Sequence, residues 1–408
     1  MHIIRRNKFL KFFLLLLIYF ILILSIKNKK IILNNDINKT KKNLKENNVE
    51  QIINKNTQKR NNALLKGKDY INKCIKGLLF NKKSVKKYNN SIISAIIPVF
   101  NCGKKIISSI RSIQNQNISQ IEIILINDFS QDNSLIIIEE LQKQDSRIKI
   151  INNKKNMGTL YSRCIGVLCA KGKYIFPLDN DEMFLDYDVF DYIYKIGINE
   201  NFDIVGFKTV YIKDYNDSID KIKDIRFSNH PNNMILHQPN LRKYPITRDK
   251  MYNDIHIWGK SIKNEIYKKG VKYLGKKRYS IFMSWAEDTI MILILFNIAK
   301  SFKFVHKYGV IHLLSNSTAS FTQPLKNRIY GEILLLDIIF DYSKNNSDKN
   351  LAVYHALYIK KKYNITKYEN NKNLIKLRLI LKKIINCKYI NKINKLKILN
   401  NFEDFNIV

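Results

Sequence analysis

The segment IEIILINDFSQDNS, residues 121–134, passes from an apolar run that Glu122 alone interrupts into a polar stretch. The apolar run is typical of a β-strand that is buried on both faces, as strands are in parallel sheets. A helix is predicted next, beginning near Ser130 or Asp132. Its apolar face recurs at helical spacing, at Leu135, Ile138 and Leu141. The segment therefore predicts one strand-helix unit of an α/β protein.

The same alternation extends on both sides of this segment. Further buried strands are predicted at 91–100, 148–152 and 173–179. Helices are predicted between them at 106–113, where isoleucines recur at helical spacing, and at about 159–170. This order predicts an α/β fold with a Rossmann-like, mostly parallel sheet, flanking helices and right-handed crossovers.

Polar and acidic residues follow the predicted strands, at the edge of the sheet where ligands of such folds bind. They lie at 98–101, 127–130 and 179–182. Neither GxGxxG nor GxxxxGK[ST] occurs there, which disfavours a dinucleotide or P-loop site. Asp179 and Asp181 are separated by one residue and could hold one hard cation such as Mg or Mn. A turn or a helix cap is the alternative interpretation of these acids.

Four motifs, in this order, resemble the nucleotide-sugar domain of family 2 glycosyltransferases, which have a GT-A fold. They are IIPVFN, EIILINDFSQDNS, RIKIINNKKNMGTLYSR and KYIFPLDNDE. The resemblance implies contacts with a nucleotide-sugar donor at Pro98, Asn101, Asp128, Arg163 and Asp179. Asp128 stands where the family contacts the base, whereas Asn127 and Phe129 depart from the family's paired acids and Gly-Ser turn. The alternatives are that Asp128 caps the following helix and that Arg163 is a surface residue.

The resemblance also implies a divalent metal, Mn or Mg, at the DxD motif. Asp181 would bind the metal directly, and Asp179 would contact the ribose or reach the metal through water. His312 would supply a third ligand or a phosphate contact, unless it is a structural histidine. Glu182 stands where the family often has a third acid, and we expect it to contact the acceptor or the sugar.

Two later segments extend the resemblance. Residues 257–270 are predicted to form an amphipathic helix, in which Trp258 either stacks on a sugar ring or lies in the core. Residues 284–300 are predicted to form an apolar helix opened by Glu287 and Asp288. By resemblance Asp288 is the catalytic base, and Glu287 orients it or holds an acceptor hydroxyl. Alternatively, both acids only oppose the helix dipole.

The chain is strongly basic, with 71 Lys+Arg against 34 Asp+Glu and a formal net charge of +37. The excess lysine is spread along the chain and no RNA- or DNA-binding motif accompanies it, so no nucleic-acid partner is expected. The five cysteines fit no CxxC or zinc spacing, which indicates buried or free thiols.

The regions outside the predicted catalytic domain differ in composition. Residues 9–26 are apolar over about the length that spans a bilayer and predict a signal anchor, with a cleaved signal peptide as the alternative. We therefore expect a single-pass membrane protein of the Golgi or endoplasmic reticulum with a luminal catalytic domain. The predicted divisions are a basic tail at 1–8, the transmembrane anchor at 9–26, a Lys/Asn-rich stem at 27–90, a GT-A domain at 91–323 with a nucleotide-sugar-binding part (91–184) and an acceptor-side part (185–323), and a basic helical C-terminal region at 324–408.

The resemblance predicts a metal-dependent, inverting glycosyltransferase of the hexosyl or N-acetylhexosaminyl type. It would transfer a single sugar from a nucleotide-diphosphate donor, with a UDP-sugar expected, to a glycan, protein or lipid acceptor. The processive Q-x-x-R-W motif is absent, which favours single transfer over polymerisation. The alternative is an inactive protein on the same fold that only binds glycans or nucleotide sugars.

Overall fold

The computed structural model describes the chain from residue 93 onward, with gaps. The described residues are 93–213, 224–227, 233–243, 256–283, 285–314, 325–342, 352–353, 355–360, 372–387, 395 and 398–399. They belong to one compact unit, Asn72–Val408. Over these ranges no helix combines the length and the apolar character that a membrane crossing requires. The predicted anchor at 9–26 and the stem at 27–90 lie outside the described residues.

The first part of the fold alternates strands and helices as predicted. Its elements are β1 (Ile93–Val99), α3 (Lys105–Gln114), β2 (Ile121–Asn127), α4 (Ser134–Gln144), β3 (Ile148–Asn152), α5 (Thr159–Cys169) and β4 (Tyr174–Pro177). Every residue of β1 and β2 is buried, which explains why both strands are mostly apolar. β3, β2, β1 and β4 are neighbours in this order and pair in parallel. The predicted α/β fold is therefore confirmed.

The second part adds further strands and the C-terminal helices. Its elements are β5 (Met183–Phe184), α6 (Val189–Asn199), β6 (Ile204–Lys213), β7 (Asp224–Phe227), β8 (Ile235–His237), α7 (Asn240–Lys243), β9 (Lys260–Lys263), α8 (Asn264–Leu274), α9 (Lys276–Tyr279), α10 (Glu287–Ile298), β10 (Ser301–Leu314), α12 (Leu325–Tyr342) and α14 (Lys372–Asn386). The sheet order is β3-β2-β1-β4-β9-β6-β10-β5, with β7 beside β6 and β8 beside β10. β9 runs antiparallel between β4 and β6 and joins the two parts of the sheet.

Two predicted helix boundaries are wrong. Residues 257–270 do not form one helix, because Lys260–Lys263 is strand β9 and the helix begins only at Asn264. The Asn264 side chain marks that boundary by donating to the carbonyls of Ala170 and Gly172, at 3.0 and 2.7 Å. Helix α4 begins at Ser134, later than predicted, because the Asp132 carboxylate accepts from the N–H groups of Ser134 and Gly103 and holds a turn before the helix.

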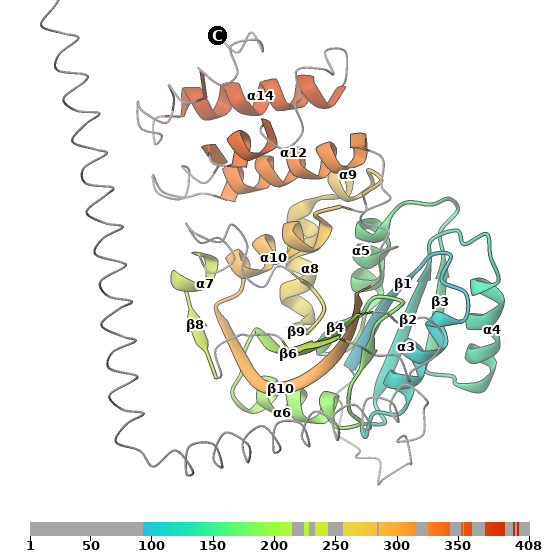
Figure 1. The fold of residues 1–408 in the computed structure, drawn as a ribbon. Coiled ribbons are helices and arrows are strands. Elements are labelled where there is room, and N and C mark those ends of the chain that lie inside the picture. Colours follow the sequence, from blue (N-terminus) through green and yellow to red (C-terminus); the bar gives the residue numbers. More distant parts are fainter. Residues whose placement is uncertain are drawn as a thin grey trace, which may run out of the picture. The chain divides into compact units, whose positions relative to one another are not determined.

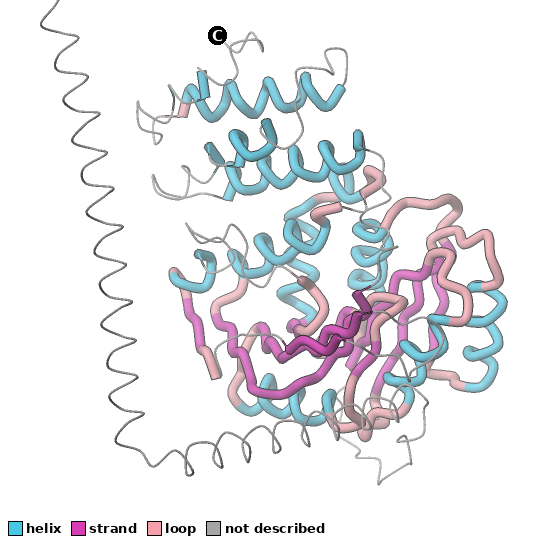
Figure 2. Tube along the Cα trace, viewed as in Figure 1, coloured by secondary structure: helices cyan, strands magenta, loops and turns pink. Residues whose placement is uncertain are grey.

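Helices cover both faces of the sheet (Figures 1 and 2). Alternating residues of β1 point to opposite faces, as a strand requires. Ile96 packs in the cluster that includes residues of α5, α8 and α10, whereas Ala95 and Ile97 pack with residues of α3, α4 and α6. Helix α12 packs on α10, and α14 packs on α12. The C-terminal helices therefore extend the core on the α5 side of the sheet.

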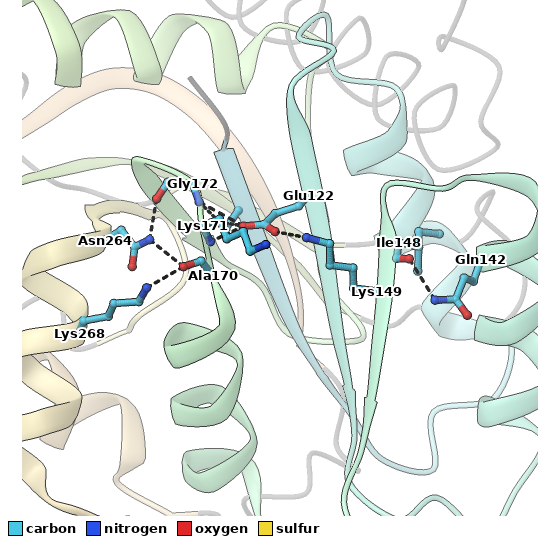
Figure 3. Close-up of polar contacts among 10 residues, drawn as sticks. Glu122, Gln142, Ile148, Lys149, Ala170, Lys171, Gly172, Asn264 and Lys268 are labelled. Atoms are coloured by element: carbon cyan, nitrogen blue, oxygen red, sulfur yellow. Dashed lines mark hydrogen bonds and ion pairs between the residues drawn. The ribbon is translucent and has the colours of Figure 1, made fainter. Parts of the chain in front are cut away.

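A buried carboxylate stabilises the amino-terminal edge of the sheet. Glu122 of β2 is 5% exposed and accepts hydrogen bonds from Ser94 Oγ at 2.6 Å and from Gly172 N at 3.1 Å. Lys171 N donates to the same oxygen, and Lys149 Nζ lies 2.6 Å from the other oxygen (Figure 3). Burial opposes ionisation, but the hydrogen bonds from Lys149, Ser94 and Lys171 outweigh it and lower the pKa of Glu122.

Replacing Glu122 by Gln should lower the free energy of unfolding by about 2 kcal/mol near neutral pH, because charge-assisted hydrogen bonds are lost. A carboxyl whose pKa is lowered by folding stabilises the fold above its unfolded pKa and loses that contribution as the pH falls through its folded pKa. The difference between wild type and variant should therefore shrink below about pH 4. Urea unfolding at several pH values measures it, and a difference that is independent of pH would contradict the assignment.

Candidate functional site

The carboxyl ends of β1 and β2 are joined by hydrogen bonds between their following loops. Asp128 N donates to Val99 O at 2.8 Å, and Gln131 N donates to the Asn101 side chain at 2.8 Å. Asn101 N in turn donates to Ser130 Oγ at 3.2 Å. These bonds hold the two loops together at the edge of the sheet where the sequence places its polar residues.

Two residues of these loops have left-handed backbone conformations. Asn101 has φ of 45° and Phe129 has φ of 66°. Phe129 stands where the resembling family has glycine, and its side chain is 45% exposed. Asn127 donates to Asn152 Oδ1 at 2.9 Å and accepts from Ser130 N, so the amide that replaces the family's acid is used in the turn. Pro98 is buried within β1, opposite Ile126 of β2.

Asp128 is buried and its carboxylate bonds to the chain before α5. One oxygen accepts from Asn153 Nδ2 and Met157 N, at 2.7 and 2.8 Å, and the other accepts from Gly158 N at 2.7 Å. Gly158 has φ of 86°, and a Cβ there would lie 2.5 Å from the Met283 carbonyl oxygen. Asp128 thus fixes the entry to α5, the helix that carries Arg163. Its contact with a nucleotide base stays a prediction.

Arg163 joins two acids that are far apart in the sequence. Its Nη1 donates to Asp288 Oδ1 at 2.6 Å and its Nη2 donates to Asp179 Oδ1 at 2.7 Å. The side chain is 2% exposed. Burial disfavours its charge, yet Asp288 and Asp179 together raise the pKa of Arg163, so it remains a cation. Arg163 is therefore not a surface residue, and it ties the end of β4 to the start of α10.

Three acids lie together after β4. Glu182 is completely buried, accepts from Asp179 N at 3.3 Å and is hydrogen-bonded to His312 Nδ1. Burial, with Asp179 and Asp181 nearby, raises the pKa of Glu182 well above its ordinary value. Burial lowers the pKa of His312, although the neighbouring carboxylates oppose this. Both shifts favour the neutral forms of Glu182 and His312.

Asp181 lies beside this pair and carries excess negative charge. Partial burial, and then the charge of Asp179, raises the pKa of Asp181, and His312 and Lys105 only partly compensate. Partial burial also raises the pKa of Asp179 against the effect of Arg163. A site in which ionised carboxylates destabilise one another is suited to a cation.

Trp258 is placed by stacking on imidazole rings. Its ring lies 4.7 Å from that of His312 with an interplanar angle of 13°, and 4.4 Å from that of His256 with an angle of 17°. The side chain is 4% exposed. These contacts place it among core side chains at the edge of the acidic cluster, and a contact between Trp258 and a sugar stays a prediction.

Glu287 and Asp288 open helix α10, as predicted. Asp288 Oδ2 accepts from Ile257 N at 3.2 Å, while its other oxygen faces Arg163. Partial burial and the charge of Asp288 raise the pKa of Glu287 to about 7.

The donor atoms fit a hard divalent cation in kind but are not arranged around one. Asp181, Asp179 and His312 supply carboxylate and imidazole donors, and the acids leave uncompensated charge. No group of three or more His, Cys, Asp and Glu side chains in the described part of the chain is arranged to hold a metal ion. Two of the groups have protein partners, since Asp179 is paired with Arg163 and His312 with Glu182. A metal here stays a prediction.

Some residues of the site carry no signal in the sequence. The backbone N–H of Ile257, which binds Asp288, belongs to a segment predicted as helix. His256 stacks on Trp258, and the charge of Lys105 lowers the pKa of Asp181, but neither residue belongs to a recognisable motif. Tyr267 of α8 is buried near Arg163, and its hydroxyl has no hydrogen-bond partner. Only Tyr267 could have been singled out, because residues 258–267 have the pattern W-x-K-x-I-K-x-x-x-Y, which is similar to a segment of many family 2 glycosyltransferases.

Comparison with known proteins relates part of this chain to a family. Residues 94–261 match the family model described as glycosyl transferase family 2. An uncharacterized glycosyltransferase of Haemophilus influenzae is 48% identical over 69 residues, which are 17% of this chain and 21% of that protein. A cholesterol galactosyltransferase of Borreliella burgdorferi is 29% identical over 196 residues, which are 48% of this chain and 52% of that protein. The match to the first three relatives spans only 21%, 27% and 23% of their lengths.

A solved structure shares the fold. The crystal structure of S. aureus TarS 1-349 in complex with UDP-GlcNAc aligns with a TM-score of 0.53 and 13% identity, over 77% of this chain and 90% of that one. At this identity the likeness concerns the fold alone, and it agrees with the GT-A type of α/β fold expected from the sequence.

Proposed function

We propose that this chain, which contains a glycosyl transferase family 2 domain, is an inverting glycosyltransferase that moves one sugar from a nucleotide-diphosphate donor to an acceptor hydroxyl. One observation carries the proposal. The buried Arg163 holds Asp179 of the DxD segment and Asp288 of the Glu-Asp pair within hydrogen-bonding distance, at 2.7 and 2.6 Å. The guanidinium of Arg163 would thus connect the residues that bind the donor to the residue that acts as the base.

We assign Asp288 as the base. An inverting transfer is a single displacement at the anomeric carbon, and it needs one carboxylate to take the proton of the acceptor hydroxyl. Arg163 and Ile257 N each donate to a different oxygen of Asp288, which fixes the orientation of the carboxylate. Glu287, whose pKa is raised to about 7, is assigned to hold the acceptor hydroxyl. No covalent enzyme intermediate is required, unlike in retaining glycosidases.

We assign Asp181, with Asp179 and His312, to a divalent cation, Mn or Mg. When bound, the cation would neutralise the diphosphate of the leaving group. The raised pKa values of Asp181 and Asp179, each due first to burial, support the assignment because a cation would relieve their repulsion. Glu182 is assigned to orient the ring of His312 through their hydrogen bond.

The donor is assigned as a UDP-sugar. TarS, which shares the fold, is crystallised with UDP-GlcNAc, and the relative in Borreliella burgdorferi is named a cholesterol galactosyltransferase. An acceptor panel should therefore contain a sterol besides glycans and peptides.

The full chain, incubated with a panel of nucleotide sugars in Mn or Mg, should release nucleoside diphosphate, and a chelator should abolish the release. Asp181→Asn should lower the rate by about 10²-fold or more, because a positioned charge at the reacting centre is lost. Asp186→Asn is the matched control, since this acid lies outside the cluster and pairs with Lys307. Release that resists both the chelator and Asp181→Asn would refute the metal assignment. Donor binding in calorimetry without turnover on any donor would favour the alternative, an inactive binding protein.

A further inference from the structure

The turn that leads into the Glu287-Asp288 pair is packed directly against the C-terminal helix α12. Gly331 of α12 lies so close to Trp285 that a Cβ at Gly331 would be 2.5 Å from the Trp285 carbonyl oxygen. Any side chain at Gly331 would therefore displace the turn. The Arg328 guanidinium lies 5.6 Å from the centre of the Trp285 ring, a distance typical of a cation–π contact.

A buried polar pair reinforces this packing. Trp285 Nε1 donates to Glu332 Oε1 at 3.2 Å, and the other oxygen of Glu332 lies 3.3 Å from His355 Nε2. Glu332 is 4% exposed and His355 is 2% exposed. Buried polar side chains of this kind are costly unless they are paired, so the three groups specify one arrangement of the turn.

The geometry of this turn determines where Asp288 lies. Ala286 has φ of 63°, a left-handed conformation that costs roughly 1–2 kcal/mol for a residue with a Cβ. Its carbonyl accepts the first helical hydrogen bond, from Ile290 N at 2.9 Å, so this residue sets the start of α10. Asp288 follows two residues later and meets Arg163 at 2.6 Å. A strained residue persists only where its surroundings hold it, and here α12 packs against the preceding residue, Trp285.

We propose that the C-terminal helices are a positioning element of the active site, in which Glu332, oriented by His355, holds Trp285 and thereby the carboxylate of Asp288. The inference rests on the proposed function for its catalytic consequence. The region after residue 324 would thus orient the catalytic base, in addition to extending the core. Glu332 and Trp285 are positioning residues, because neither touches the reacting atoms.

The test compares full-chain Trp285→Phe and Glu332→Met with wild type. Both variants remove the bond between the indole and the carboxylate. Trp285→Phe keeps an aromatic ring at this position, and Glu332→Met keeps nearly the volume of the glutamate side chain. Each should lower kcat by about 10- to 100-fold, since small misplacements of a catalytic group have effects of this size, with KM for the donor and Kd for UDP changed less than about twofold. Glu332→Gln, which retains an acceptor for Trp285, should restore most of kcat.

Arg278→Gln is the control. Arg278 binds α12 through Asp337 and Asp341, at 3.0 and 2.9 Å, so the variant loosens the same helix without touching the Trp285 turn. It should lose stability and keep the kcat of wild type per folded molecule.

Hydrogen exchange supplies a readout that does not depend on turnover. The amides of residues 287–290 should exchange faster in Trp285→Phe and Glu332→Met than in wild type, and at the wild-type rate in Arg278→Gln. Wild-type kcat and wild-type exchange in both variants would overturn the inference, and so would equal losses of kcat in Arg278→Gln. If wild type turns over no donor, the proposed function fails, while the exchange data still decide whether α12 holds the turn.

Discussion

Asp288→Asn is expected to bind UDP as wild type does and to lower kcat by about 10²–10⁴-fold, the usual loss when a general base is removed. Asparagine keeps the shape of the side chain and one acceptor for Arg163, but it cannot take a proton from the acceptor hydroxyl. The effect should appear in kcat, with little change in KM for the donor, because the base acts only as the transition state forms. Single-turnover transfer from a labelled donor measures it.

The control for this variant is Asp203→Asn. Asp203 is also a buried acid with a cationic partner, Lys263 Nζ at 2.9 Å. It directly precedes β6 and therefore lies at the amino-terminal end of that strand, away from the site. Its loss should lower stability and leave the kcat of folded protein unchanged. Near-wild-type turnover by Asp288→Asn would exclude Asp288 as the base and leave Glu287 as the candidate.

Much of the fold could be predicted because its signals are local. The four strands β1 to β4 are mostly apolar, and the helices between them have apolar residues at helical spacing, so each element is visible within its own segment. Strand β9 was missed for the opposite reason. It is only four residues long, and its conformation depends on pairing with β4 and β6, which are distant in the sequence.

The acids of the candidate site could be singled out from their positions after predicted strands, whereas their partners could not. Arg163 and Asp288 are 125 residues apart, and no periodicity relates them. Asp128 shows that a motif does not determine the contacts of a residue. The motif points to a nucleotide, while the observed carboxylate binds three groups of its own chain at 2.7–2.8 Å. A motif predicts where a residue lies in the fold, but hydrogen bonds between distant segments decide which atoms it meets.

Arg163→Met should have the largest effect on the fold of any substitution in the site. It leaves Asp179 and Asp288 without their shared cation, and removing one partner of a buried ion pair lowers the free energy of unfolding by about 3 kcal/mol. Transfer activity should be lost as well, because the base is no longer oriented. Arg163→Lys should fold better than Arg163→Met yet remain slow, since an ammonium group cannot bind both carboxylates in the planar geometry of the guanidinium.

The pH dependence distinguishes an electrostatic role of Arg163 from simple packing. Burial already raises the pKa of Asp179 above its ordinary 3.8, and Arg163 opposes that rise. Without Arg163 the pKa rises further, so the contribution of this carboxyl to stability is lost as the pH rises through the higher value. The loss of unfolding free energy in Arg163→Met, measured by urea unfolding, should therefore be larger at pH 8 than at pH 5.

Arg147→Met is the control. It removes a more exposed arginine, which is paired with Asp145, and should lower the free energy of unfolding by under about 1 kcal/mol. An equal deficit for Arg163→Met at both pH values would show that its side chain acts through packing alone.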